Sequence, residues 1–249
     1  MKATEFTLEG ITRTPSWRNE DNVAPKLTGI PKDAKPFPGY PGLVYHFYKK
    51  GSIGFHLGDY TVLHVMDSKK LRRVGKLYFT SANNVIPGAI ETSDLFVYEP
   101  YKRQGIAANM YRLLAEDMGK IVLADREGGQ TPEARKLWLA MSESKIPSLA
   151  VKGWVEIDIS FYDFAESEED QIVNIIMKIG GEFLYHNKKK WIVTFNMMPN
   201  QAKTELRAAI TNQLTRSVYQ HEDMMPDFES GLLVISRAKF ETMTGYQPQ

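Results

Sequence analysis

Hydrophobic runs separated by polar links predict β-strands in the middle of the chain. Residues 60–66 and 74–80 are rich in β-branched and aromatic side chains, and the charged link at 67–73 suits a hairpin between them. Residues 95–98, with the sequence Leu-Phe-Val-Tyr, form a third short run that Glu99-Pro100 ends. The pattern therefore predicts a meander of three strands.

A helical period follows the third strand. Four hydrophobic residues recur at near-3.6 spacing and predict one buried helix face: Ile106, Met110, Leu113 and Leu114. Gly119 ends this helix, and the apolar run 121–124 is typical of a buried strand. A second helix begins at Pro132, with buried positions expected at Ala134, Leu137, Trp138 and Met141. The order meander, helix, strand, helix indicates an α/β core within residues 44–160.

The two ends of the chain differ from this core. Proline is concentrated between Pro15 and Pro41, so residues 1–43 are expected to form an extended arm, whose aromatic side chains pack on another part of the protein. Residues 161–249 are expected to form a second, α+β unit. Its elements are a helix from Ser167 to the Gly180-Gly181 stop, a hairpin at 182–185 and 191–195, a helix around Leu206 and a strand at 232–235.

Composition narrows the class of protein. The 249 residues carry a net charge of +1 and are 43% hydrophobic, which is typical of a soluble globular protein. The absence of cysteine excludes disulfides, thiolate metal sites and cysteine nucleophiles. The chain begins without the apolar segment of a signal peptide, and no apolar run is long enough to span a membrane. A cytoplasmic protein without a membrane partner is expected, and no metal site is expected because the acidic residues around His221 match no ligand spacing.

The most informative segment lies between the third strand and the first helix. The strand stops at Glu99-Pro100, a short basic turn with a glycine follows, and the helix starts at once. Backbone N–H groups at a helix N-terminus have no internal partner and lie at the positive end of the helix dipole, so a diphosphate can bind there. Gly105 allows the backbone to approach such a group closely, and Lys102 and Arg103 add positive charge.

This segment resembles motif A of the GCN5-related N-acetyltransferases, which has the pattern (Gln/Arg)-x-x-Gly-x-(Gly/Ala). Lys102 takes the first position, in place of Gln or Arg, while Gly105 and Ala107 take the glycine and the last position. The resemblance implies an acetyl-CoA (or other acyl-CoA) cofactor. Its pantetheine arm would lie along Leu95, Phe96 and Val97, and its pyrophosphate on the backbone N–H groups of Arg103, Gln104, Gly105, Ile106 and Ala107.

The resemblance also implies a fold. It is α/β, with a mixed, largely antiparallel sheet flanked by helices, followed here by the C-terminal α+β extension. The two helices that normally separate the family's first strands have no counterpart in the pattern, so the chain is similar to the reduced, compact members found in bacteriophages. For a phage-encoded protein the compartment would be the host cytoplasm.

Catalytic residues are less clearly marked. Where the family often has a tyrosine that protonates the departing thiolate, the corresponding residue is Trp138, whose indole does not ionise usefully. Ser142 or water is left for that role. Glu99 and Asp125, at the ends of the two cofactor strands, are the favoured candidates for the base that accepts the amine proton.

A hairpin near the C-terminus suggests a second kind of partner. Lys188, Lys189 and Lys190 adjoin Trp191, and cations beside an aromatic ring can hold a phosphate backbone and stack a base. A plain solvated hairpin tip is the alternative interpretation. The sequence thus favours an acyl-CoA-dependent N-acyltransferase that acts on an amine by direct transfer. The alternatives are a nucleic-acid base-modifying enzyme of the same fold and a catalytically inactive binding or structural protein.

Overall fold

The computed structural model describes most of the chain and divides it into two compact units. The described residues are 7–8, 11–12, 23–50, 60–124, 132–143, 146–158, 166–187, 189–196, 199–213 and 229–244. Unit 1 comprises Met1–Tyr78 and Asp94–Asn109, and unit 2 comprises Phe79–Ser93 and Met110–Gln249. The domain boundaries expected at residues 43 and 160 stay a prediction.

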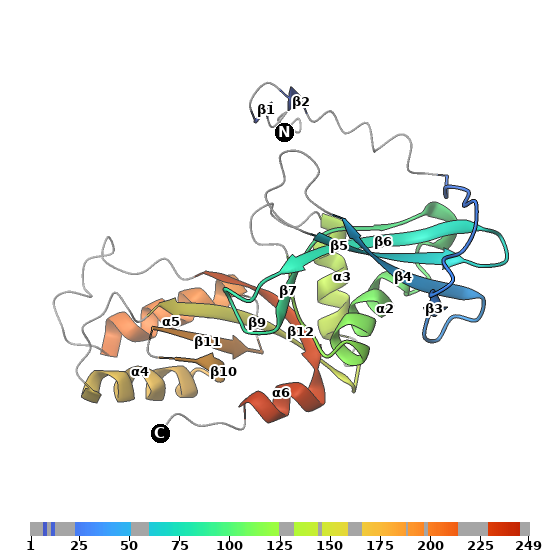
Figure 1. The fold of residues 1–249 in the computed structure, drawn as a ribbon. Coiled ribbons are helices and arrows are strands. Elements are labelled where there is room, and N and C mark those ends of the chain that lie inside the picture. Colours follow the sequence, from blue (N-terminus) through green and yellow to red (C-terminus); the bar gives the residue numbers. More distant parts are fainter. Residues whose placement is uncertain are drawn as a thin grey trace. The chain divides into compact units, whose positions relative to one another are not determined.

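Unit 1 is built on neighbouring strands. Hydrogen bonds join them in the order β3-β4-β5-β6-β7, and Figure 1 shows β4, β5 and β6 side by side. β4 pairs with β5 in antiparallel register, with His46 opposite His64. The predicted link between β5 and β6 is confirmed as a tight turn, in which the Asp67 carboxylate accepts hydrogen bonds from the N–H groups of Lys69 and Lys70. The bounds are β3 Lys35–Pro36, β4 Leu43–Lys50, β5 Tyr60–Asp67, β6 Arg72–Ser81 and β7 Ala89–Val97.

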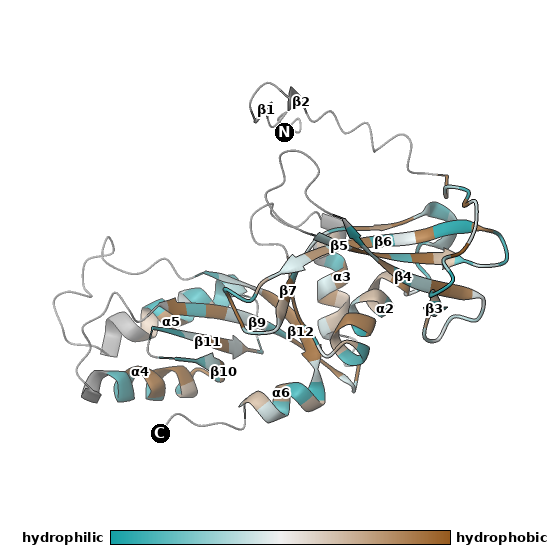
Figure 2. Ribbon diagram, viewed as in Figure 1, coloured by the Kyte–Doolittle hydropathy of each residue, from teal (hydrophilic) through white to brown (hydrophobic). Residues whose placement is uncertain are grey.

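The two sides of the unit 1 strands differ in burial. Leu63, Val65 and Leu77 on one side are fully buried. On the other side His64 and Tyr78 are half-buried, while Val62, Met66 and Val74 are buried. Figure 2 shows the corresponding alternation of hydrophobic and hydrophilic stretches along β6. The two sides of these strands thus differ in how deeply their residues are buried.

Unit 2 contains a mixed but mostly antiparallel set of strands. Their order is β7-β8-β12-β9-β11-β10, and among the strand pairs whose register is described only β7 with β8 is parallel. β12 lies between β8 and β9, so the C-terminal segment contributes a central strand of this sheet. The pattern had predicted β8, β10, β11 and β12, but it missed β9. The bounds are β8 Ile121–Leu123, β9 Leu149–Asp158, β10 Glu182–His186, β11 Lys190–Phe195 and β12 Ser230–Ser236.

Helices cover both sides of the unit 2 strands. α4 and α5 pack on one side, where Ile172, Ile176 and Leu206 join the buried side chains of β9, β10 and β11. α6 packs on the other side through Phe240. The bounds are α2 Ile106–Arg112 (continued by a π-helical turn, η2, Leu113–Asp117), α3 Pro132–Glu143, α4 Glu166–Lys178, α5 Pro199–Gln213 and α6 Arg237–Thr244. The protein is thus of the α/β class, and α6 was not predicted.

One short pair of strands completes the described elements. β1 (Thr7–Leu8) and β2 (Ile11–Thr12) form a separate antiparallel pair. No helix among the described residues is both long and apolar enough to cross a membrane.

Candidate functional site

The turn between β7 and α2 in unit 1 is held in a defined conformation. β7 ends at Val97, and a short 3₁₀ helix, η1 (Glu99–Tyr101), begins with Pro100 in its first turn. The Tyr98 N–H donates to the Val74 carbonyl, and the Tyr101 hydroxyl donates to Asp67 Oδ2 at 3.1 Å. Burial acts to raise the pKa of Asp67. Hydrogen bonds from the Lys70 N–H, the Tyr101 hydroxyl and the Lys69 N–H outweigh it, so the pKa is lowered and the carboxylate stays charged.

The backbone N–H groups of this turn form the strongest candidate binding feature. The φ angle is −64° at Lys102, +61° at Arg103 and +76° at Gly105, and it is not positive at Gln104. Alternation of this kind turns successive N–H groups toward one side, as in anion-binding loops. Among the described residues no acceptor is found for the N–H groups of residues 103–108, and the Asn109 N–H is the first to be bonded, to the Gly105 carbonyl. Lys102 to Gly105 are exposed, so these groups can be reached from solvent.

Residues of the N-terminal arm support this turn from one side. The Tyr40 hydroxyl donates to the Gln104 carbonyl at 2.6 Å, and Asn109 Nδ2 donates to the Pro38 carbonyl at 2.6 Å. Phe37 is buried and stacks on Tyr40, and burial raises the pKa of the Tyr40 hydroxyl. The prediction that aromatic residues of the arm pack on the protein is therefore confirmed for Phe37 and Tyr40. Their contact with the turn could not be read from the sequence, because more than 60 residues separate the partners.

Two lysines converge on one aromatic ring beside the turn. Lys102 Nζ and Lys76 Nζ each lie 5.9 Å from the centre of the Phe96 ring. Lys76 belongs to β6 and was not among the predicted site residues. Its contact with Phe96 joins two different strands, so no local spacing in the sequence marked it. These two cations, one of them in the turn itself, add to the positive potential of its N–H groups.

The predicted site residues of β7 and the turn differ in burial. Leu95, Phe96 and Val97 are half-buried on β7, while Ile106 is buried and Ala107 half-buried at the start of α2. The candidate base Glu99 is exposed, and its carboxylate forms an ion pair with Lys102. The other candidate base, Asp125, lies outside the described residues.

The parallel pairing of β7 with β8 in unit 2 is short. It extends over Ala89 to Glu91 and Ile121 to Leu123. The buried Thr92 hydroxyl then donates to the Leu123 carbonyl at 3.0 Å, which ends the pairing with a side-chain hydrogen bond. β7 itself continues to Val97.

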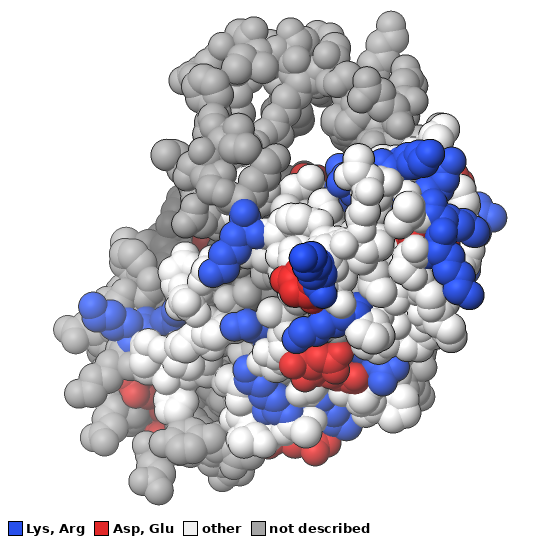
Figure 3. Space-filling view, turned by 45° about the vertical axis from the view of Figure 1, so that its right-hand side comes forward, with Lys and Arg blue, Asp and Glu red and all other residues white. Residues whose placement is uncertain are grey.

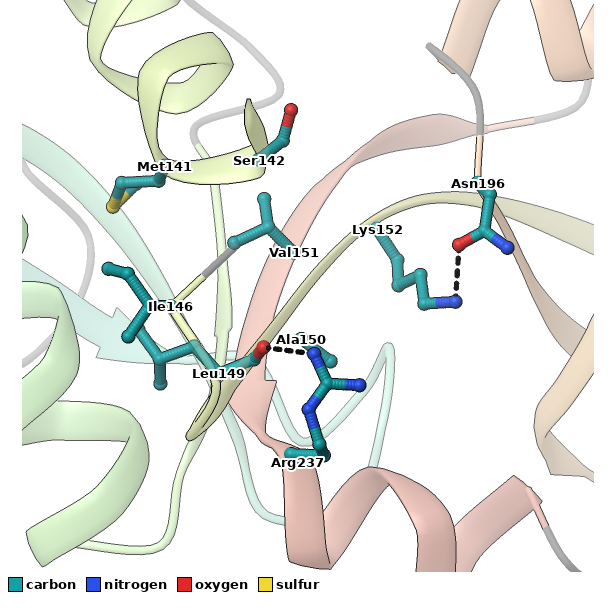
Figure 4. Close-up of a pocket in the computed structure, with 9 residues that line it drawn as sticks. All are labelled: Met141, Ser142, Ile146, Leu149, Ala150, Val151, Lys152, Asn196 and Arg237. Carbon is teal, nitrogen blue, oxygen red and sulfur yellow. Dashed lines mark hydrogen bonds between the residues drawn. The ribbon is translucent and has the colours of Figure 1, made fainter. Parts of the chain in front are cut away.

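Two α3 residues that were considered for catalysis, Trp138 and Ser142, lie in unit 2. Trp138 is 2% exposed and lies 4.9 Å from the Tyr111 ring, so it is a core residue, as predicted. Ser142 is exposed and donates to the Leu139 carbonyl. It also lines a cavity of about 160 Å³ (Figure 4). The two cationic side chains that line this cavity have hydrogen-bond partners. Lys152 donates to Asn196 and Glu182, and Arg237 donates to the carbonyls of Pro147 and Leu149.

The hairpin considered for nucleic acid is packed against its own unit. Trp191 is 6% exposed and packs edge-to-face on Phe183, so its ring is not accessible to a base. Lys190 donates to the Asn84 carbonyl and lies 3.5 Å from the Glu156 carboxylate. Lys189 is exposed, and Lys188 lies outside the described residues. Among the described residues no cluster of three histidine or carboxylate side chains could hold a metal ion.

A half-buried histidine of unit 1 gives a testable pH dependence. Burial, and then the positive charges of Arg73, Lys76 and His46, lower the pKa of His64 from the usual histidine value of 6.5 to about 4. Between these two values the unfolded chain binds a proton that the folded protein does not, so stability is lost as the pH falls through that window.

We therefore expect His64→Gln to reduce the acid sensitivity of the protein. The free energy of unfolding, measured in urea at pH 7 and pH 5, should fall about 1 kcal/mol more for the parent than for the variant. This difference is smaller than the full pKa shift would give, because solvent partly screens the half-buried ring. Parallel pH profiles for the two proteins would contradict the assignment.

Comparison with known proteins adds little to these observations. No protein family matches the chain, and no curated protein is similar to it. One solved structure with some likeness contains a GCN5-related glucosamine N-acetyltransferase region in a fungal multi-domain GH3 β-N-acetylglucosaminidase. The TM-score is 0.26 at 14% identity, and the match covers 68% of this chain and 20% of the other. This chain thus spans about a fifth of that protein, and a likeness at this level carries no argument about activity.

Proposed function

We propose that the protein is an acyl-CoA-dependent N-acyltransferase with a core like that of the GCN5-related N-acetyltransferases. The observation that carries the proposal is the exposed turn at Lys102 to Gly105, whose N–H groups have no acceptor among the described residues. Such a turn, with positive φ at Arg103 and Gly105 and with Lys102 and Lys76 nearby, suits a diphosphate. The pyrophosphate of CoA is the group that the motif resemblance implies.

The strand before the turn supports the same proposal. In the family the pantetheine arm lies along the strand that precedes the pyrophosphate turn. β7 occupies this place, and its pairing with β8 ends at Glu91, six residues before the strand does. Backbone groups beyond that point would be available to the amides of a pantetheine arm. Leu95, Phe96 and Val97, which are half-buried, would border it.

The reaction would be a direct transfer. The amine nitrogen attacks the thioester carbonyl, the new C–N bond forms, and the C–S bond breaks to release the CoA thiolate. Glu99 or Asp125 would accept the amine proton, and for Glu99 this requires its ion pair with Lys102 to open. Because Trp138 is buried and has no ionisable proton, the thiolate would take its proton from water.

The burial of Trp138 also favours a second candidate function. A protein that binds acyl-CoA but lacks both an acid at this position and a free carboxylate at Glu99 would be a non-catalytic binding protein. The two functions share the cofactor site and differ in turnover, so binding and activity must be measured separately.

Calorimetric titration with acetyl-CoA and with free CoA tests the cofactor site. We expect micromolar binding by the parent protein and weakening of about five- to tenfold by Lys102→Gln, since one charge-assisted contact contributes on the order of 1–1.5 kcal/mol. Arg103→Gly should weaken binding similarly while keeping the positive φ of this position. Lys49→Gln, which removes an exposed lysine of β4, is the matched control and should change the affinity less than about twofold.

Three outcomes separate the possibilities. Binding lost in Lys102→Gln and Arg103→Gly, together with acyl transfer to an amine, supports the enzyme. Binding with the same variant pattern but without turnover on any amine supports the non-catalytic protein. Absence of binding to either ligand refutes the assignment of the turn as a CoA site.

A further inference from the structure

Aromatic side chains of four neighbouring strands lie in two contacting ring pairs and one further ring in unit 1. Tyr48 of β4 lies 4.6 Å from His64 of β5, and Tyr60 of β5 lies 5.6 Å from Tyr78 of β6. Lys76 of β6 connects the second pair to β7, because its Nζ lies 5.5 Å from the Tyr78 ring and 5.9 Å from the Phe96 ring. We define the ring face by Tyr48, Tyr60, His64, Tyr78 and Phe96.

The ring face is on the less deeply buried side of these strands, although Val62, Met66 and Val74 on the same side are buried. Its members alternate with Leu63, Val65 and Leu77, which are fully buried on the opposite side. Tyr48 is 37% exposed, and the other four rings are half-buried. Large aromatic side chains at partly exposed strand positions are suited to contact with a flat partner.

The described part of unit 1, to which the ring face belongs, is strongly positive. Over residues 23–50, 60–78 and 94–109 of unit 1 there are twelve lysine and arginine residues and four aspartate and glutamate residues, although the whole chain has a net charge of +1. Figure 3 shows lysine and arginine side chains gathered at its upper right with little acidic surface among them. After burial, the charges of Arg73 and Lys76 are the largest causes of the lowered His64 pKa, which places positive potential at the ring face itself.

We propose that the ring face of unit 1 binds single-stranded nucleic acid, with bases stacked on Tyr48 and Tyr78 and phosphates held by Lys76 and neighbouring cations. Stacking on partly exposed aromatics within a positive surface is how proteins bind single strands without reading sequence. The rings distinguish this partner from an acidic peptide, which would use the cations but leave the rings without a partner. They also distinguish it from duplex DNA, whose bases are already stacked. This inference goes beyond the proposed acyltransferase function and does not depend on it.

Fluorescence anisotropy of the full chain tests the proposal with labelled oligonucleotides of about 20 nucleotides, long enough to cover one site. The probes are single-stranded RNA, single-stranded DNA of the same sequence, and the corresponding DNA duplex. We expect the single strands to bind more tightly than the duplex and to weaken steeply with added salt. A difference between the affinities for single-stranded RNA and single-stranded DNA would show that the protein recognises the ribose.

Variants separate stacking from charge. Tyr48→Ala and Tyr78→Ala should each weaken single-strand binding by about five- to 100-fold, the range expected for loss of one stacked base. Tyr48→Phe and Tyr78→Phe keep the ring and should bind within about threefold of the parent. Met177→Ala, which truncates an exposed apolar residue of α4 in unit 2, is the control for a surface substitution elsewhere.

The results that would overturn the proposal are specific. Equal affinity for single strand and duplex, or efficient competition by polyglutamate, would show that only charge is recognised. Alanine variants that bind like their phenylalanine counterparts would show that the rings take no part. A variant that fails to fold, as judged by circular dichroism, is replaced in the comparison by the alanine variant of the other tyrosine.

Discussion

Gly105→Ala is expected to destabilise the protein by about 2–4 kcal/mol and to weaken CoA binding. Two physical effects add at this residue. Its φ of +76° costs an alanine about 1–2 kcal/mol, and a Cβ built on it would lie only 2.9 Å from the Tyr40 hydroxyl oxygen. Displacing Tyr40 would also break its hydrogen bond to the Gln104 carbonyl and move the turn. Thermal unfolding and acetyl-CoA titration of the full chain measure the two consequences.

Matched variants separate strain from steric conflict at Gly105. Gly39→Ala places an alanine at the same φ of +76° in the same unit, but its Cβ would meet nothing within 4 Å, so only the backbone cost of about 1–2 kcal/mol is expected. Tyr40→Phe removes the hydroxyl, so the double variant Tyr40→Phe with Gly105→Ala should be less destabilised than the sum of the single variants. Strict additivity would contradict the proposed contact with Tyr40.

The role of Gly105 shows how far the sequence could define the candidate site. The motif predicted a close approach of a ligand to this glycine, and the strand, turn and helix around it are present. The structure adds that a protein group, the Tyr40 hydroxyl, already approaches it. Tyr40 and Lys76 were missed because they are joined to the turn by tertiary contacts alone, and no local spacing encodes such contacts.

Fold prediction succeeded where a local period was strong and failed where it was not. The strands around His64 and Leu77 are runs rich in β-branched and aromatic residues, and both were found. The helix beginning at Ile106 has helical spacing, and it was found as well. The strand β9 was missed because Lys152 and Gly153 interrupt its apolar pattern, although its partners β11 and β12 cover it on both edges. The central position of β12 was equally hidden, since pairing of Leu233 with Leu123 joins residues more than 100 positions apart. Tertiary pairing decides such elements more than propensity does.

The glycine pair after α4 was predicted as a helix stop, and the structure gives its two members different roles. The Gly180 N–H donates to the Met177 carbonyl and the Gly181 N–H to the Ile176 carbonyl, which is the Schellman arrangement for the end of a helix. Gly180 has the left-handed φ of +78° that this motif requires, and a Cβ on it would meet nothing within 4 Å. Gly181 has no positive φ but is closely surrounded. Its Cβ would lie 2.5 Å from Ile176 Cγ2 and 2.9 Å from both the Ile176 carbonyl oxygen and Phe195 Cε1.

Gly181→Ala is therefore expected to be the more damaging of two neighbouring substitutions, with a loss of about 3 kcal/mol or more in the free energy of unfolding. The methyl group would meet a backbone carbonyl and the fully buried Phe195, neither of which can move without disturbing the core between α4 and β11. Gly180→Ala, one residue earlier, should cost about 1–2 kcal/mol from backbone strain alone. Urea unfolding of both variants gives the comparison. Equal losses would mean that the left-handed turn, and not the packing against Ile176 and Phe195, is what requires glycine at the end of α4.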